Sequence, residues 1–253
     1  MAVKLFRYAM LPLLFQLVAG CSDNKPAADQ PKSERIAEQP KVPAAEDARL
    51  IVVFGDSLYA GYQLEQGEGF APELERALAA RGIAARVHNA GVSGDTSAAG
   101  LQRLAFTLDG LDRRPDLVIV GLGGNDMLRG LKPEDTRQNL DAILTELDRR
   151  NIDAMLTGML ASRNLGKDYA SRFDAIYPAL ATKYDIPLYP FFLEDVVGRR
   201  DLMLADGIHP NERGIDIIAG RVAPVVALDL GSTSYARRDG ADLGRVQGAR
   251  RER

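Results

Sequence analysis

Ser57 follows a short apolar run in the stretch IVVFGDSLYAGY (51–62), where an aspartate precedes it and glycines lie on both sides. The apolar run is typical of a strand covered on both faces, so the serine would be exposed on rigid backbone at the end of that strand. A helix that begins there would aim backbone N–H groups at a developing negative charge. The alternative is a serine that only caps the helix.

The chain contains two histidines, His88 and His209, that could serve as a base for this serine. A serine hydroxyl is a weak nucleophile that needs an adjacent base, and histidine titrates near neutral pH. His209 lies in DGIHPN, three residues after Asp206, so that carboxylate can accept a hydrogen bond from Nδ1–H of the same imidazole. His88 lies within a predicted strand, and we expect it to be structural.

Gly94 and Asn125 follow two further apolar runs, in NAGVSGDTS and GLGGNDMLRG. A glycine lets a backbone N–H approach a substrate because no Cβ intervenes. The asparagine amide is an uncharged donor, and one such donor to an oxyanion contributes about 3–4 kcal/mol in other enzymes. Asn125 could instead only shape a turn.

Taken together, the four stretches that contain Ser57, Gly94, Asn125 and His209 resemble the sequence motifs of the SGNH, or GDSL, hydrolase family. The resemblance covers about residues 49–228. The chain is most similar to the branch of bacterial thioesterases, lysophospholipases and arylesterases. The resemblance implies a catalytic triad of Ser57, His209 and Asp206. It also implies an oxyanion hole made by the N–H groups of Ser57 and Gly94 and the amide of Asn125.

The neighbours of these motifs have supporting roles in our interpretation. We expect hydrogen-bonding or capping roles for Asp56, Asp95 and Asp126. Tyr59, Tyr62, Met127 and Leu128 border the acyl site or belong to the core. Tyr59 is bulkier than the small residue that the family pattern has after its serine and leucine, which affects the expected substrate entrance. The loop over residues 160–169 should shape the pocket.

The sequence therefore predicts a serine carboxylic ester hydrolase that cleaves esters or thioesters through an acyl-enzyme on Ser57, with no metal or organic cofactor. Expected substrates are small acyl esters or lysophospholipids. Two alternatives remain: a deacetylase of cell-envelope polysaccharide, and a non-catalytic binding lipoprotein on the same scaffold. A dinucleotide-binding protein is not favoured, because GLGGND is not a spaced G-x-G-x-x-G after the first strand.

Short apolar runs alternate with helical patterns along the chain. Strands are predicted over 49–54, 85–90, 116–122, 153–159 and 186–191, and helices over 69–81, 96–109, 133–150, 168–183 and 210–227. This alternation predicts an α/β fold, a flavodoxin-like three-layer sandwich whose five-stranded parallel sheet has helices on both faces. Ligand sites in such folds lie at the carboxyl ends of the strands, so Ser57, Gly94 and Asn125 should share one edge.

Composition limits the other classes of function. The chain has 253 residues, 46% of them hydrophobic, and a formal net charge of −3, which does not indicate a nucleic-acid partner. The single cysteine excludes an internal disulfide, and two histidines exclude a histidine-rich metal site. We expect a monomer.

The N-terminus, MAVKLFRYAMLPLLFQLVAGC, has a basic start and an apolar run over residues 8–19 that is too short to span a membrane comfortably. Its end, LVAGC, resembles the lipobox of bacterial lipoproteins, which implies cleavage before Cys21 and a lipid on its sulfur. An ordinary secretory signal is the alternative. We expect a periplasmic protein anchored by lipid to a membrane, the outer more than the inner.

These features divide the chain into four parts. Residues 1–20 are a lipoprotein signal peptide, and residues 21–48 are the lipidated cysteine and a flexible linker rich in Pro, Ala and charge. Residues 49–228 form the hydrolase domain. Residues 229–253 are predicted to be a disordered basic tail, either simply solvated or in contact with anionic lipid headgroups.

Overall fold

The structure is a computed structural model that describes the backbone of residues 48–248 and the side chains of residues 48–231. The predicted signal peptide, Cys21 and the linker up to residue 47 lie outside the described residues, as do residues 249–253.

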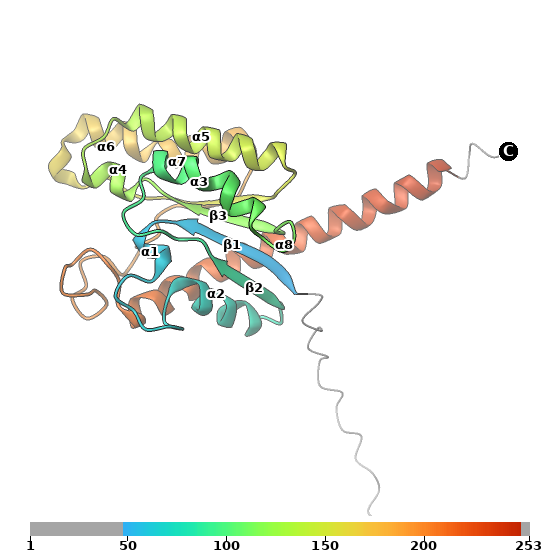
Figure 1. Ribbon diagram of the computed structural model, residues 1–253, viewed down its shortest axis with the longest axis horizontal. Helices are drawn as coiled ribbons and strands as arrows, with labels where there is room; N and C mark the ends of the chain where they lie inside the picture. Colours follow the sequence, from blue (N-terminus) through green and yellow to red (C-terminus); the bar gives the residue numbers. More distant parts are fainter. Residues whose placement is uncertain (1–47, 249–253) are drawn as a thin grey trace, which may run out of the picture. The chain divides into compact units, whose positions relative to one another are not determined.

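A five-stranded parallel sheet forms the centre of the described region (Figure 1). Its strands are β1 (Arg49–Gly55), β2 (Ala85–Asn89), β3 (Leu117–Gly121), β4 (Ala154–Thr157) and β5 (Leu188–Tyr189). The spatial order is β2-β1-β3-β4-β5, and every neighbouring pair is parallel. The order reverses direction after β2, which places a crevice at the carboxyl ends of β1 and β3. The predicted α/β fold with a five-stranded parallel sheet is confirmed.

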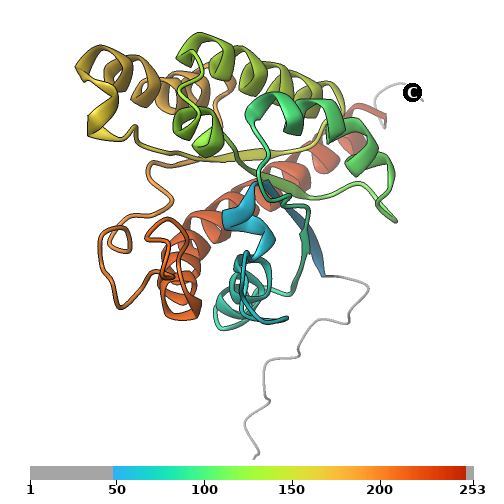
Figure 2. The ribbon, with the colours of Figure 1, turned by 60° about the vertical axis from the view of Figure 1, so that its left-hand side comes forward.

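Helices cover both faces of the sheet (Figure 2). The main helices are α2 (Phe70–Ala79), α3 (Ser97–Asp109), α5 (Pro133–Arg149), α6 (Lys167–Asp174), α7 (Ile176–Tyr184) and α8 (Glu212–Gly248). Shorter turns are α1 (Ser57–Ala60), α4 (Gly124–Leu128) and a 3₁₀ turn, η2 (Arg163–Leu165). Helices α2 and α8 pack on one face, whereas α3, α5 and α7 pack on the other.

Strand β1 shows why both faces are covered. Ile51 and Val53 belong to the core beneath α2 and α8, whereas Val52 and Phe54 belong to the core beneath α3 and α5. All four side chains are fully buried. Because successive side chains of a strand point to opposite faces, an unbroken apolar run requires a layer of helices on each side.

Prolines divide or shorten two of the predicted elements. The predicted helix over 168–183 is divided into α6 and α7 at Ala175. Pro178 lacks the N–H that would bond to the carbonyl four residues earlier, so the helix does not continue across this point. The predicted strand over 186–191 retains only Leu188–Tyr189, because Pro187 and Pro190 flank it without ladder donors.

The last helix is longer than its predicted bounds of 210–227. Helix α8 continues as helical backbone to Gly248, across most of the segment predicted to be a disordered tail. Pro224 lies inside this helix, and no proline follows it to end the helix. None of the helices in the described part of the chain is long and apolar enough to cross a membrane.

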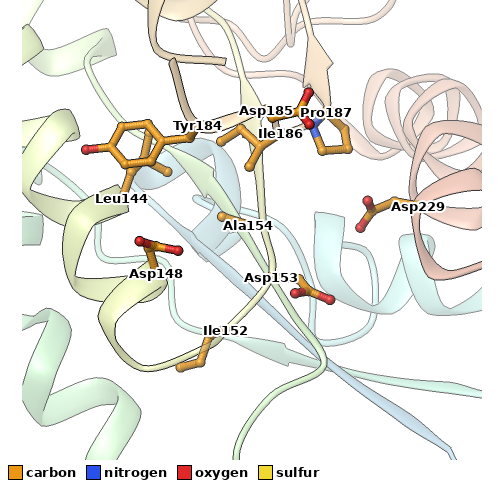
Figure 3. A pocket seen from close by; sticks show the side chains of 10 residues that line it. All are labelled: Leu144, Asp148, Ile152, Asp153, Ala154, Tyr184, Asp185, Ile186, Pro187 and Asp229. Carbon is orange, nitrogen blue, oxygen red and sulfur yellow. The ribbon is translucent and has the colours of Figure 1, made fainter. Parts of the chain in front are cut away.

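A cavity of about 270 Å³ lies at the amino ends of β4 and β5 (Figure 3). Asp148, Asp153, Asp185 and Asp229 are among the side chains around it. It lies at the edge of the sheet opposite to the carboxyl ends, and none of the residues predicted to form the active site lines it.

Candidate active site

Ser57 is the first residue of α1, immediately after β1 and its neighbour Asp56. The Asp56 side chain caps α1, since its Oδ1 accepts the Leu58 N–H at 3.1 Å. The turn ends at Gly61, whose φ of 80° is left-handed. The serine is therefore fixed between a buried strand and a capped helical turn.

His209 lies in the loop between β5 and α8. An isolated antiparallel bridge between Met203 and Pro210 closes this loop, and the Leu204 N–H donates to the His209 carbonyl at 2.7 Å. Asp206 Oδ1 accepts the backbone N–H groups of Ile208 and His209 at 2.9 and 3.0 Å. One carboxylate oxygen thus fixes the loop while the other remains available for the imidazole.

The three predicted triad residues form one hydrogen-bonded chain. His209 Nε2 is 2.8 Å from Ser57 Oγ, and His209 Nδ1 is 2.6 Å from Asp206 Oδ2. Hydrogen bonds from the His209 backbone N–H and imidazole and from the Ile208 N–H lower the pKa of Asp206 to about 2. The carboxylate therefore stays ionised at any pH at which a histidine base works.

The loop that carries Gly94 is held by side chains from α4 and the residue after it. Asn125 Nδ2 donates to the Asp95 carbonyl at 3.0 Å, and Arg129 donates to the Gly94 carbonyl at 2.9 Å. Gly94 has a φ of 86°, which glycine adopts without strain. Asn125 Nδ2 also lies 3.4 Å from Asp56 Oδ2. Its second hydrogen is therefore held only by this long contact.

The other aspartates beside the motifs have structural partners. Asp126 accepts the Ser97 N–H at 2.8 Å and its hydroxyl at 2.5 Å, and Asp95 forms an ion pair with Arg103 at 2.6 Å. Asp56 is 3% exposed, and this burial raises its pKa to about 6. No acid of this group contacts Ser57 Oγ or the imidazole in the described structure.

A pocket of about 780 Å³ opens above the triad. Ser57, His209, Gly94 and Asn125 all line it, so the predicted shared edge is present in the structure. Its other walls are mainly apolar and include Tyr62, Met127, Leu128, Met159, Phe191 and Leu193. Residues 160–163 of the loop after β4 also line it, as expected from the sequence.

Tyr59 does not border this pocket. Its side chain is 1% exposed, its ring stacks on Phe192 with centroids 4.7 Å apart, and its hydroxyl bonds to the Thr157 hydroxyl. The expectation that Tyr59 alters the substrate entrance is therefore wrong, because the ring points away from the pocket and into the core.

Tyr62 has a contact that the sequence did not indicate. Its ring lies against the His209 imidazole with centroids 4.4 Å apart. The sequence predicts that Tyr62 either borders the acyl site or belongs to the core; in the structure it lines the pocket and also packs on the histidine. The spacing of five residues from Ser57 carries no signal of this contact.

Metal ligands do not cluster in the described residues: they contain no group of three His, Cys, Asp or Glu side chains placed to hold an ion.

Comparison with known proteins defines the class. A model of the GDSL-like lipase/acylhydrolase family matches residues 53–217. The chain belongs to this family, and it is a serine ester hydrolase.

Individual relatives agree with this class. The chain is 40% identical to esterase TesA of Pseudomonas aeruginosa over 64% of this chain and 80% of that protein. It is 39% identical to thioesterase 1/protease 1/lysophospholipase L1 of Escherichia coli over 70% of this chain and 82% of that protein. The crystal structure of AlinE4, an SGNH-hydrolase family esterase, matches with a TM-score of 0.63 and 54% identity, covering 73% of this chain and 97% of that one.

Proposed function

We propose that Ser57 is the nucleophile of this hydrolase, that His209 is its general base and acid, and that Asp206 orients the imidazole. The observation that carries this assignment is the continuous chain of hydrogen bonds from Ser57 Oγ through His209 to Asp206, at 2.8 and 2.6 Å. Asp206 accepts from Nδ1–H and leaves Nε2 free to take the serine proton.

The reaction proceeds in two acyl-transfer steps. Ser57 Oγ attacks the substrate carbonyl while its proton passes to His209 Nε2, and the imidazolium then protonates the leaving alcohol or thiol. Water then attacks the acyl-enzyme while it gives a proton to the same nitrogen, and the imidazolium returns that proton to Ser57 Oγ as the bond to the acyl group breaks and the acid leaves. These steps need only groups that the chain supplies.

The developing oxyanion is bound by the N–H groups of Ser57 and Gly94 and by the second amide hydrogen of Asn125. The hydrogen bonds to the Gly94 and Asp95 carbonyls hold this loop in place before substrate arrives. Preorganised donors of this kind stabilise a transition state without reorganisation.

Fatty acyl esters, including lysophospholipids, are the proposed substrate class. The apolar walls of the pocket support this choice, since an acyl chain gains free energy by leaving water for such a lining. A polysaccharide would present hydroxyl groups to these apolar side chains, and those hydroxyl groups would lack hydrogen-bond partners. A panel of acyl esters, acyl thioesters and acetylated sugars tests this choice, and a preference for acetylated sugars would contradict it.

A fluorophosphonate probe tests the mechanism directly. We expect covalent labelling at Ser57, shown by peptide mapping, and its loss in Ser57→Ala and His209→Ala. Both variants should lose nearly all ester turnover while their circular dichroism spectra stay unchanged. Asn164→Ala, an exposed change in the loop after β4, is the control. Wild-type turnover in His209→Ala would contradict the proposed base.

The proposed location is the periplasmic side of a bacterial membrane, with the hydrolase domain, 49–228, attached through a lipid on Cys21. The lipobox-like end of the signal supports this proposal. Cys21→Ser should move the protein from the membrane fraction to the soluble fraction and abolish incorporation of labelled palmitate. Retention of the label in this variant would contradict the anchor.

A further inference from the structure

Large apolar side chains are exposed around the mouth of the active-site pocket. They form what we call the apolar rim: Tyr62, Leu128, Leu160, Val197 and Ile208. Each of them is between 38% and 56% exposed. They come from four separate segments, which follow β1, β3, β4 and β5 at the carboxyl edge of the sheet. Apolar side chains gathered at one site, unlike scattered ones, indicate an interaction surface.

Positive charge accompanies three of the five rim residues, Leu128, Leu160 and Val197, whereas acids lie near the other two: Glu65 near Tyr62 and Asp206 near Ile208. The segments 128–132, 160–167 and 197–200 contain six cationic residues and no acidic residue, although the whole chain has a net charge of −3. The six are Arg129, Lys132, Arg163, Lys167, Arg199 and Arg200. All six side chains are exposed.

The acids next along the chain neutralise one of these six cations, Arg199. Asp168 is paired with Arg172 at 2.8 Å, and Asp201 is paired with Arg199 at 3.1 Å. Within the described residues, the remaining five cations of the rim segments have no ion-pair partner. Around Leu128, Leu160 and Val197, the pocket mouth therefore combines apolar side chains with cations that have no ion-pair partner.

We infer that the apolar rim docks this enzyme on an anionic phospholipid surface. The exposed apolar side chains enter the boundary between headgroups and acyl chains, where their burial is favourable, and the cations bind lipid phosphates. A second copy of the chain is a poorer occupant, because two such faces would bring like charges together. Docking would set the pocket mouth against the lipid layer, so an acyl chain could enter without crossing water.

Fluorescence can report on the rim alone, because the chain contains no tryptophan. Leu160→Trp places a single reporter on the rim, and Val197→Trp places a second one on a different loop. Phe106→Trp is the matched control, since Phe106 is 83% exposed on α3 and does not line the pocket. The full chain is used, so any binding by the N-terminal segment is the same in all three.

With vesicles that contain phosphatidylglycerol, we expect emission from the two rim reporters to shift to the blue and to be quenched by brominated acyl chains. Emission from the Phe106→Trp control should not change. Lys167→Gln or Arg200→Gln added to the Leu160→Trp chain should each weaken binding to these vesicles about fivefold. Vesicles of phosphatidylcholine alone should bind more weakly.

Two results would overturn the inference. Equal lipid responses at the rim and at position 106 would show that docking does not involve the rim. A blue shift that depends on protein concentration and occurs without lipid would assign the rim to a second copy. Fluorophosphonate labelling of the Phe106→Trp chain reports separately on the proposed catalytic serine, so failure of docking is distinguishable from failure of the mechanism.

Discussion

The pKa values of two carboxylates near Ser57 are shifted in opposite directions. Asp206 receives hydrogen bonds from two backbone N–H groups and the imidazole, which lower its pKa to about 2. Asp56 is buried with one backbone donor, and burial raises its pKa to about 6. Asp206 is therefore suited to stabilise a cationic imidazole, whereas a charge on Asp56 at neutral pH is unfavourable because the side chain is buried.

The raised pKa of Asp56 should make the stability of the protein depend on pH. Its pKa is raised in the folded state, so its favourable contribution is fully present below pH 3.8 and is lost as pH rises through about 6. We expect the unfolding free energy of the wild type, relative to Asp56→Asn, to fall by about 2 kcal/mol between pH 4 and pH 7. Urea denaturation at several pH values measures this difference.

Asp112→Asn is the control for this experiment. Asp112 is exposed and paired with Arg86, which lowers its pKa, so its titration does not make stability fall as pH rises. Its variant should show no such change between pH 4 and pH 7. A pH-independent difference between the wild type and Asp56→Asn would mean that Asp56 stays ionised when buried.

At the scale of the elements, glycines on the neighbouring strands β1 and β3 leave space for the Tyr59 ring. Gly55 and Gly121 are paired in register on these strands. A Cβ on Gly55 would overlap the Tyr59 ring, and a Cβ on Gly121 would overlap its hydroxyl and the ring carbon that carries it. The ring therefore lies flat against backbone at the centre of the sheet. This accounts for the large residue after the GDSL motif, because the Tyr59 ring is accommodated here and not at the substrate pocket.

Gly121→Ala should destabilise the fold by about 1–3 kcal/mol, because the added methyl group overlaps the Tyr59 ring. In the double variant with Tyr59→Leu, the loss should be smaller than the sum of the two single losses. Denaturant unfolding of the four proteins measures the coupling. Additive losses would show that the ring and the glycine do not meet.

The bounds of helices and strands were predicted well where the apolar pattern was long and clear. Elements too short to show a pattern were not predicted. The apolar runs of β1 and β3 and the spacing of α5 identified these elements to within a residue or two. The turns α1 and α4 span four and five residues, too short for any periodic pattern. They nevertheless position Ser57 and Asn125, and the motif alone indicated those side chains.

For the whole molecule, the candidate site depends on the packing of α8 beneath the sheet. Ser57 and His209 are separated by 152 residues, and His209 lies shortly before this helix. The buried side chains of α8 against the core continue to Leu230. The loop that presents His209 is thus anchored by the helix that follows it.

Truncation should define how much of α8 the fold needs. A stop after Gly231 should leave the melting temperature and ester turnover unchanged. A stop after Arg221 removes Val222, Val226 and Leu230, whose burial contributes about 1.5–3 kcal/mol each, a sum comparable to the whole stability of a domain. Thermal unfolding of both proteins is the measurement. Loss of stability in the longer protein would show that residues beyond 231 also pack.

The sequence by itself determined the parallel α/β fold, its strand order along the chain and the identities of the candidate triad and oxyanion residues. Those features depend on local apolar patterns and short motifs, which a single chain displays directly. Tertiary structure alone decided that Tyr59 is core, that Tyr62 packs on His209 and that an apolar and cationic rim surrounds the pocket. These contacts depend on strand register and on loops that come together only when the sheet is assembled. No local sequence pattern encodes such long-range contacts.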